Sequence, residues 1–171
     1  MSAMGYKMRT CLSACFLAVF SAASLAQQSS MSGPPRQGGV DQRGDHVMGF
    51  SHDSTTHHFH LLRDGGEIVV TANDPKDTAS VEQIRMHLSH IVSMFSNGNF
   101  NAPMVIHDTN PPGVATMIRL KSSIRYTFVE IPQGARIRVE TSSPETTDAV
   151  HAFLLFQILD HKTGDSPAIA D

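Results

Sequence analysis

The sequence predicts an α+β domain in which two ββα units form a four-stranded antiparallel sheet with the helices packed on one face. Two observations favour this class. Pairs of short segments with alternating apolar residues occur twice, and a long segment with helical periodicity follows each pair. The two halves also align with each other, Gly65 with Gly134 and Pro75 with Pro144. Two units of this kind are expected to pack as a two-layer sandwich.

The first 26 residues have the pattern of a secretory signal peptide. Lys7 and Arg9 supply the positive charge, and residues 12–25 form an apolar run that is too short to span a bilayer. Small residues precede Gln27, so we expect cleavage before this residue and a periplasmic or secreted protein that is no longer attached to a membrane.

Cysteine content and charge narrow the function of the mature chain. Cys11 and Cys15 are the two cysteines, and both precede the expected cleavage point, so the mature protein would have neither a disulfide nor a thiolate ligand. A lipoprotein signal around Cys15 is the alternative, although most of the apolar run follows that cysteine. Cleavage would leave 11 basic and 16 acidic residues, a net charge of −5 that argues against nucleic-acid binding.

Two further segments are expected outside the folded domain. Residues 27–45 are rich in Gly, Pro, Ser and Gln and have few apolar side chains to bury, which predicts a disordered linker. A single globular domain is expected over residues 46–165, and residues 166–171 are expected to form a loose tail.

Periodicity places the elements of the first unit. Residues 55–62 and 67–72 are predicted to be strands that are joined by a turn at residues 63–66, where two glycines permit a positive φ. Residues 78–96 are predicted to form a helix, because apolar residues recur there at helical spacing.

The second unit repeats this order after an irregular connection. Within the connection, residues 104–106 are predicted to be a short strand and residues 114–120 a short helix. Residues 124–131 and 135–141 are the next predicted strands. A final helix is expected from Pro144 to about residue 162, with a serine cap before the proline.

The last helix is apolar on nearly all sides, which is typical of a helix that is buried on more than one side. Either residues 99–120 cover it or a second subunit does, in a homodimer. We favour coverage within the chain.

Three histidines lie on the first predicted strand. Because side chains alternate along a strand, His58 and His60 share the outer face of the sheet and are close enough to bind one metal ion. His57 points the other way, to the edge of the core. The alternative for His58 and His60 is a polar outer face that tolerates histidine.

A second candidate set lies on the helix at residues 78–96. His87, His90 and Met94 form a stripe at the edge of its apolar face. Imidazole and thioether groups suit copper, since methionine favours Cu(I). The alternative is a methionine that fills the core beside solvated histidines.

The remaining histidines give weaker indications. His107 is followed by Asp108, which could orient its ring, and the protonated form of His161 near a helix C-terminus would favour the helix dipole. His151 is expected in the core or at an interface. No known hydrolase, phosphate-binding or dinucleotide-binding motif is present, so no catalytic residue is assigned.

Four blocks resemble a family of small exported bacterial proteins, over residues 46–165. They are Thr55–Phe59, Ile84–Ile91, Pro111–Gly113 and Phe156–Asp165. The family has no established activity, so the resemblance implies export and brings no catalytic residues. Some members carry the label aspartate carbamoyltransferase. The STRT-type and HPxQ-type motifs of such transferases are absent here, so the sequence does not support that label.

Together these features predict an exported, non-enzymatic protein that binds a transition metal, copper or zinc, through His58, His60, His87, His90 and Met94. All ten histidines lie after the predicted signal peptide, and imidazole and thioether ligands suit a compartment in which thiols oxidise. The alternative is a metal-free domain that binds a ligand or another protein. The second alternative is a small enzyme that depends on a histidine.

Overall fold

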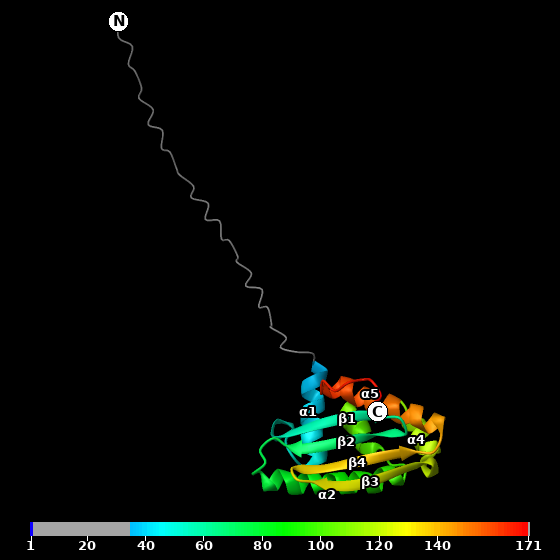
Figure 1. Cartoon of the computed structure of the whole chain (residues 1–171). Helices are drawn as coiled ribbons and strands as arrows, with labels where there is room; N and C mark the ends of the chain where they lie inside the picture. Colours follow the sequence, from blue (N-terminus) through cyan, green and yellow to red (C-terminus); the bar gives the residue numbers. More distant parts are fainter. Residues whose placement is uncertain (2–34, 171) are drawn as a thin grey trace. The chain divides into compact units, whose positions relative to one another are not determined.

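The computed structural model describes Met1 and residues 35–170, which belong, apart from Met1, to one compact unit (Figure 1). The predicted signal peptide and residues 27–34 lie outside the described residues, apart from Met1. The α+β class is confirmed. A sheet has the strand order β1 (Thr55–Leu62), β2 (Gly65–Ala72), β4 (Gly134–Thr141) and β3 (Ile124–Ile131).

The named strands pair antiparallel, but a parallel bridge between Leu62 and Ala170 adds the C-terminal segment beside β1 and makes the sheet mixed. The prediction of a loose tail is therefore wrong up to residue 170. The Ala170 N–H donates to the Leu61 carbonyl at 2.8 Å, and the Phe59 N–H donates to Asp165 at 2.9 Å. These contacts pair two of the backbone groups that β1, as an edge strand, would otherwise expose.

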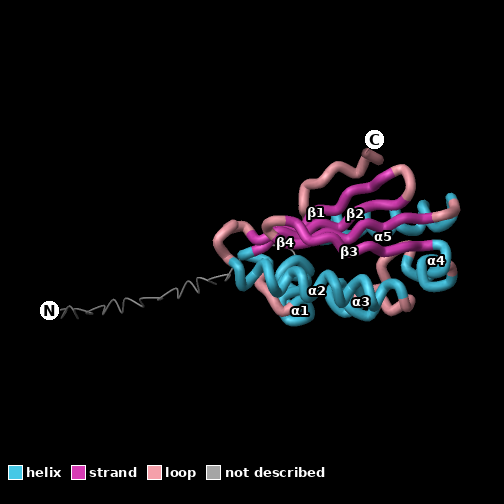
Figure 2. The backbone as a smooth tube through the Cα atoms, turned by 60° about the horizontal axis from the view of Figure 1, so that its bottom comes forward, coloured by secondary structure: helices cyan, strands magenta, loops and turns pink. Residues whose placement is uncertain are grey.

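Two long helices pack on one face of the sheet. Helix α2 (Thr78–Ser96) packs against β2, β3 and β4, whereas α5 (Pro144–His161) packs against β1, β2 and β4. Figure 2 shows α2 beside the strands, with α1 (Pro35–Met48) and α3 (Asn101–His107) in the same layer. The two helices begin at side-chain caps, in which Asp77 accepts from the Ser80 N–H and Ser143 from the Thr146 N–H.

The connection between the two strand pairs is helical. The short helix α4 (Val114–Arg119) confirms the prediction for that segment, but α3 (Asn101–His107) replaces the strand predicted at residues 104–106. Burial of Pro103, Ile106 and His107 on one side of α3 explains the difference, because tertiary packing decides so short an apolar run. The two predicted ββα units therefore do not account for the whole fold, because further helices such as α3 and α4 lie between them.

Helices α3 and α4 also supply the predicted coverage of α5. Helix α4 packs on α5, and the ring of His107 in α3 lies 5.0 Å from that of Phe156. Leu159 of α5 is nevertheless 75% exposed, so the chain leaves part of this apolar helix uncovered. A homodimer through this helix therefore stays a prediction.

Helix α1 (Pro35–Met48) occupies most of the segment that was expected to be a disordered linker, and that expectation is wrong for residues 35–45. Val40 is only 1% exposed. The Arg43 Nε–H group faces the carbonyls of Val105 and Ile106 at 3.1 and 2.8 Å. Docking against α3 and α5 orders a segment whose composition favours disorder.

The remaining regular elements are two 3₁₀ turns, His52–Ser54 and Lys121–Ser123. None of the helices in residues 35–170 has the length and apolar run that a bilayer crossing requires.

Candidate functional site

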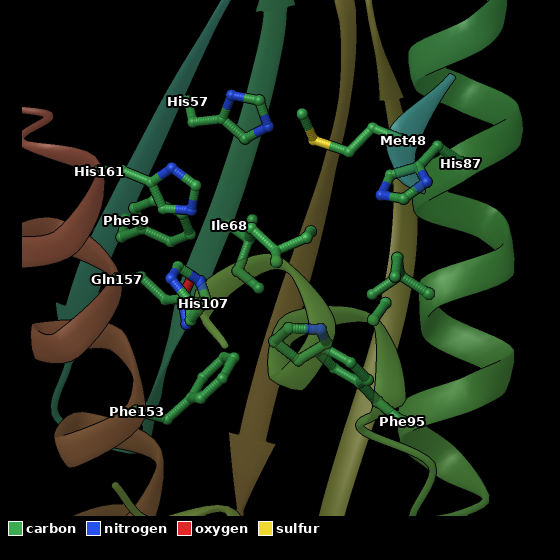
Figure 3. A pocket seen from close by; sticks show the side chains of 14 residues that line it. Met48, His57, Phe59, Ile68, His87, Phe95, His107, Phe153, Gln157 and His161 are labelled. Atoms are coloured by element: carbon green, nitrogen blue, oxygen red, sulfur yellow. The ribbon is translucent and has the colours of Figure 1, made fainter. Parts of the chain in front are cut away.

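Four histidines from four elements surround one cavity of about 70 Å³ beneath β1 (Figure 3). His57 comes from β1, His87 from α2, His107 from α3, and His161 is the last residue of α5. Aromatic and aliphatic side chains form much of the remaining wall: Phe59, Ile68, Ile91, Phe95, Ile106 and Phe153. The topology brings together imidazoles that lie far apart in the sequence.

Burial keeps three of these imidazoles neutral. It lowers the pKa of His57 from 6.5 to about 3, with repulsion from His161, His87 and His58 adding to the effect. Burial likewise lowers the pKa of His87 to about 4, with His90 contributing, and that of His161 to about 4, with His107 contributing. At neutral pH these three side chains present uncharged ring nitrogens.

His161 lies between two of the other rings. Its ring is parallel to that of His57, with centroids 5.9 Å apart and planes 2° apart, and it meets the ring of His107 edge-on at 4.9 Å. Because its pKa is lowered, the neutral form is favoured. The expectation that a protonated His161 serves the helix dipole is therefore wrong.

His107 is almost fully buried and has a partner at each ring nitrogen. Nδ1 lies 2.6 Å from Asp160 Oδ2, and Nε2 lies 2.9 Å from Gln157 Oε1. The carboxylate that orients this ring comes from α5, rather than from the neighbouring Asp108, which is exposed and left-handed at φ 51°. His107 thus joins α3 to α5 at one end of the cavity.

Met48 brings a thioether to the other end of the cavity. In Figure 3 its side chain extends into the space between the rings of His57 and His87, and all three residues line the cavity. Phe50 packs against both imidazoles, at 6.1 Å from His57 and 5.6 Å from His87. The sequence did not indicate Met48 as a candidate ligand, because its helix was not expected.

His58 and His60, the predicted strand ligands, lie on the opposite face of the sheet from His57, as alternation requires. Their rings are 6.1 Å apart and nearly parallel, at 13°. His58 Nδ1 is 2.8 Å from Asp165 Oδ1, so His58 fixes the C-terminal segment on β1. They do not share a cavity with the predicted helix ligands.

His87, His90 and Met94, the predicted helix ligands, line a second cavity of about 290 Å³ beside α3. His87 also lines the first cavity, so its imidazole forms part of the wall between the two. His90 is exposed and Met94 is half-buried. Of the five predicted ligands, His87 is the one that lines the same cavity as His57.

Within residues 35–170, no group of three or more His, Cys, Asp or Glu side chains is arranged to hold a metal ion. A site built from two imidazoles and a thioether is of a different type, because methionine supplies the third donor. Comparison with known proteins found no matching family model, no matching curated protein and no matching solved structure.

Proposed function

We propose that this protein is an exported, non-enzymatic binder of Cu(I), which it holds through Met48, His57 and His87. The observation that carries the proposal is the position of the Met48 thioether between two imidazoles in one cavity (Figure 3). This set replaces the five ligands expected from the sequence and keeps His87 from them.

The donor set favours Cu(I) over zinc. A thioether is a soft ligand that suits Cu(I), whereas zinc sites take thiolate, imidazole and carboxylate ligands in a tetrahedral arrangement. Burial lowers the pKa of His57 to about 3 and that of His87 to about 4, so both rings are ready to bind a cation without first losing a proton.

The surroundings of these donors also favour the lower oxidation state. Phe50 is only 4% exposed and contacts both imidazoles, and Ile91 and Phe95 add apolar wall. An apolar shell limits access of water to a metal ion and influences its redox potential. The N-terminal signal pattern supports export, where a cysteine-free mature chain would depend on ligands of this kind.

An anaerobic titration of the purified protein with Cu(I), in competition with the chromophoric chelator bicinchoninate, tests the proposal. We expect one equivalent to bind. Met48→Leu keeps the apolar volume but removes the sulfur, and should weaken binding by at least roughly tenfold, since even changes outside the ligand set cost about that much. His57→Asn should weaken it similarly.

Two matched variants serve as controls. Met86→Leu removes a thioether from α2 that is 71% exposed and lies outside both cavities, and His60→Asn removes an imidazole from the outer face of β1. Both should bind Cu(I) as the unmodified protein does. Equal affinity in Met48→Leu, or loss of binding in His60→Asn, would contradict the proposed ligand set.

A further inference from the structure

The second cavity, beside α3, adjoins the cavity that holds the proposed copper ligands. Its volume is about 290 Å³, and His87, Ile91 and Ala102 line both cavities. The last two residues of α1 divide between them, with Val47 in the second cavity and Met48 in the first. His87 is thus the proposed copper ligand that belongs to both cavities.

Two side chains in the wall of the second cavity carry donors of the kind proposed for the first. His90 supplies an imidazole and Met94 a thioether. They are four residues apart on α2, so their side chains are neighbours on one side of the helix. His90 is exposed, Met94 is half-buried, and Val105, which lines the same cavity, is 54% exposed. This part of the second cavity is therefore in contact with solvent.

Apolar side chains screen the ligands in the first cavity. Phe50, which is 4% exposed, packs against the rings of both His57 and His87. An ion that gives up its ligands in apolar surroundings loses favourable interactions, so a path with donors along it is favoured over a path without them. The imidazole and the thioether of the second cavity suit Cu(I) and lie on such a path.

We infer that His90 and Met94 form an outer Cu(I) site, through which the ion enters and leaves an inner site made of Met48, His57 and His87. The ion passes by ligand exchange, in which a bond to His90 or Met94 breaks as a bond to His87 forms, and copper stays in the Cu(I) state. The outer site has two donors rather than three, so it binds more weakly and stays empty in competition with bicinchoninate. The passage rests on the proposed function, whereas the outer site can be tested without it.

The rate of copper release tests the passage. Protein loaded with one equivalent of Cu(I) is mixed anaerobically at pH 7.5 with bicinchoninate, at concentrations at which the rate no longer rises with the chelator. We expect His90→Asn/Met94→Leu to release copper roughly tenfold more slowly. Its affinity should be unchanged, because the outer site is not part of the final complex, so entry must be slowed by the same factor. His87 stays neutral in this variant, because burial, more than His90, lowers its pKa.

The matched control is His60→Asn/Met86→Leu, which makes the same two changes at residues outside both cavities. It should release copper as the unmodified protein does. Unchanged release from His90→Asn/Met94→Leu would overturn the passage. A loss of affinity in that variant would overturn it as well, because the two residues would then be ligands of the final complex.

The outer site is tested by itself in Met48→Leu/His57→Asn, which lacks two inner ligands. In nuclear magnetic resonance spectra of protein with ¹³C-methyl-labelled methionine, Cu(I) should shift the Met94 signal and leave that of Met86 unchanged. If this variant does not fold, a second equivalent of Cu(I) added to the unmodified protein should give the same shift. An unchanged Met94 signal would overturn the outer site. A shifted Met94 signal in a protein whose affinity does not depend on Met48 would contradict the inner site instead, and with it the passage.

Discussion

At the scale of single residues, His107 is fixed by a partner that the sequence does not identify. The sequence gives a weak indication of the neighbouring Asp108, but adjacent residues at the end of a helix point in different directions. Asp160, on α5, lies 2.6 Å from the ring instead. The imidazole is 1% exposed and the carboxylate 13% exposed, so this pair is screened little by solvent.

Replacement of Asp160 by Asn should therefore destabilise the protein by about 1.5–3 kcal/mol, because the buried imidazole loses its hydrogen bond to a carboxylate. Denaturant unfolding measures the change. Asp108→Asn is the matched control. Asp108 is exposed, and asparagine tolerates its left-handed backbone, so we expect a change within about 0.5 kcal/mol. Similar losses in the two variants would contradict a special role for the His107–Asp160 pair.

Only part of the candidate site was predictable at this scale. Strand alternation correctly placed His57 toward the core, and helical periodicity selected His87. Neither pattern could bring these two residues together with Met48 and His161, because their proximity depends on how α1 and α5 dock. Periodicity specifies which face a side chain occupies, but not which face of another element it meets.

At the scale of elements, the segments with strong periodicity were predicted well. All four main strands and helices α2 and α5 have apolar residues at regular spacing over at least one face. Helix α1 has no such pattern, and its interior includes Gly39 and Gly44. Helices this weak in propensity depend on tertiary contacts, which a reading of local sequence does not include.

One such contact is made by Arg43, whose Nε–H reaches the last carbonyls of α3. We expect Arg43→Met to raise amide hydrogen exchange in α1 and α3 and to lower the free energy of unfolding by about 1–2 kcal/mol, the range for a hydrogen bond from a charged donor. Hydrogen exchange read by mass spectrometry would detect the local opening.

The control for Arg43 is Arg119→Met. Arg119 pairs with Glu145, but both side chains are more than half exposed, so their interaction should contribute little to stability. Exchange in α1 should stay unchanged in this variant. If Arg43→Met has no effect on exchange either, α1 is fixed by its apolar residues alone, Val40 among them.

At the scale of the whole molecule, the fold concentrates titratable side chains in its core. His57, His87 and His161 each have a lowered pKa because folding removes their rings from water. His52 is an opposing case, because its hydrogen bond to Asp45 raises its pKa. Its stabilising effect is complete below pH 6.5 and is lost as the pH rises through the raised value. At low pH His52 therefore stabilises the fold, whereas the three cavity histidines destabilise it.

The protein should therefore lose stability as the pH falls from 7.5 to 5. The unfolded chain, with histidine pKa values near ~6.5, binds protons more readily than the folded protein, whose three cavity histidines stay neutral down to about 3 or 4. The stabilisation is complete above the unfolded value. Below it, each ring forfeits about 1.4 kcal/mol per pH unit until its folded pKa is reached.

At pH 5 the combined loss from the three rings should reach several kcal/mol, on the order of half the stability of a typical domain. Melting temperatures at pH 7.5 and pH 5 measure it. His161→Phe should reduce the difference between the two temperatures by roughly a third, because it removes one of three similar contributions. The exposed His46, replaced by Phe, should leave it unchanged. Equal melting temperatures at the two pH values would mean that the imidazoles of the cavity reach water in the folded protein.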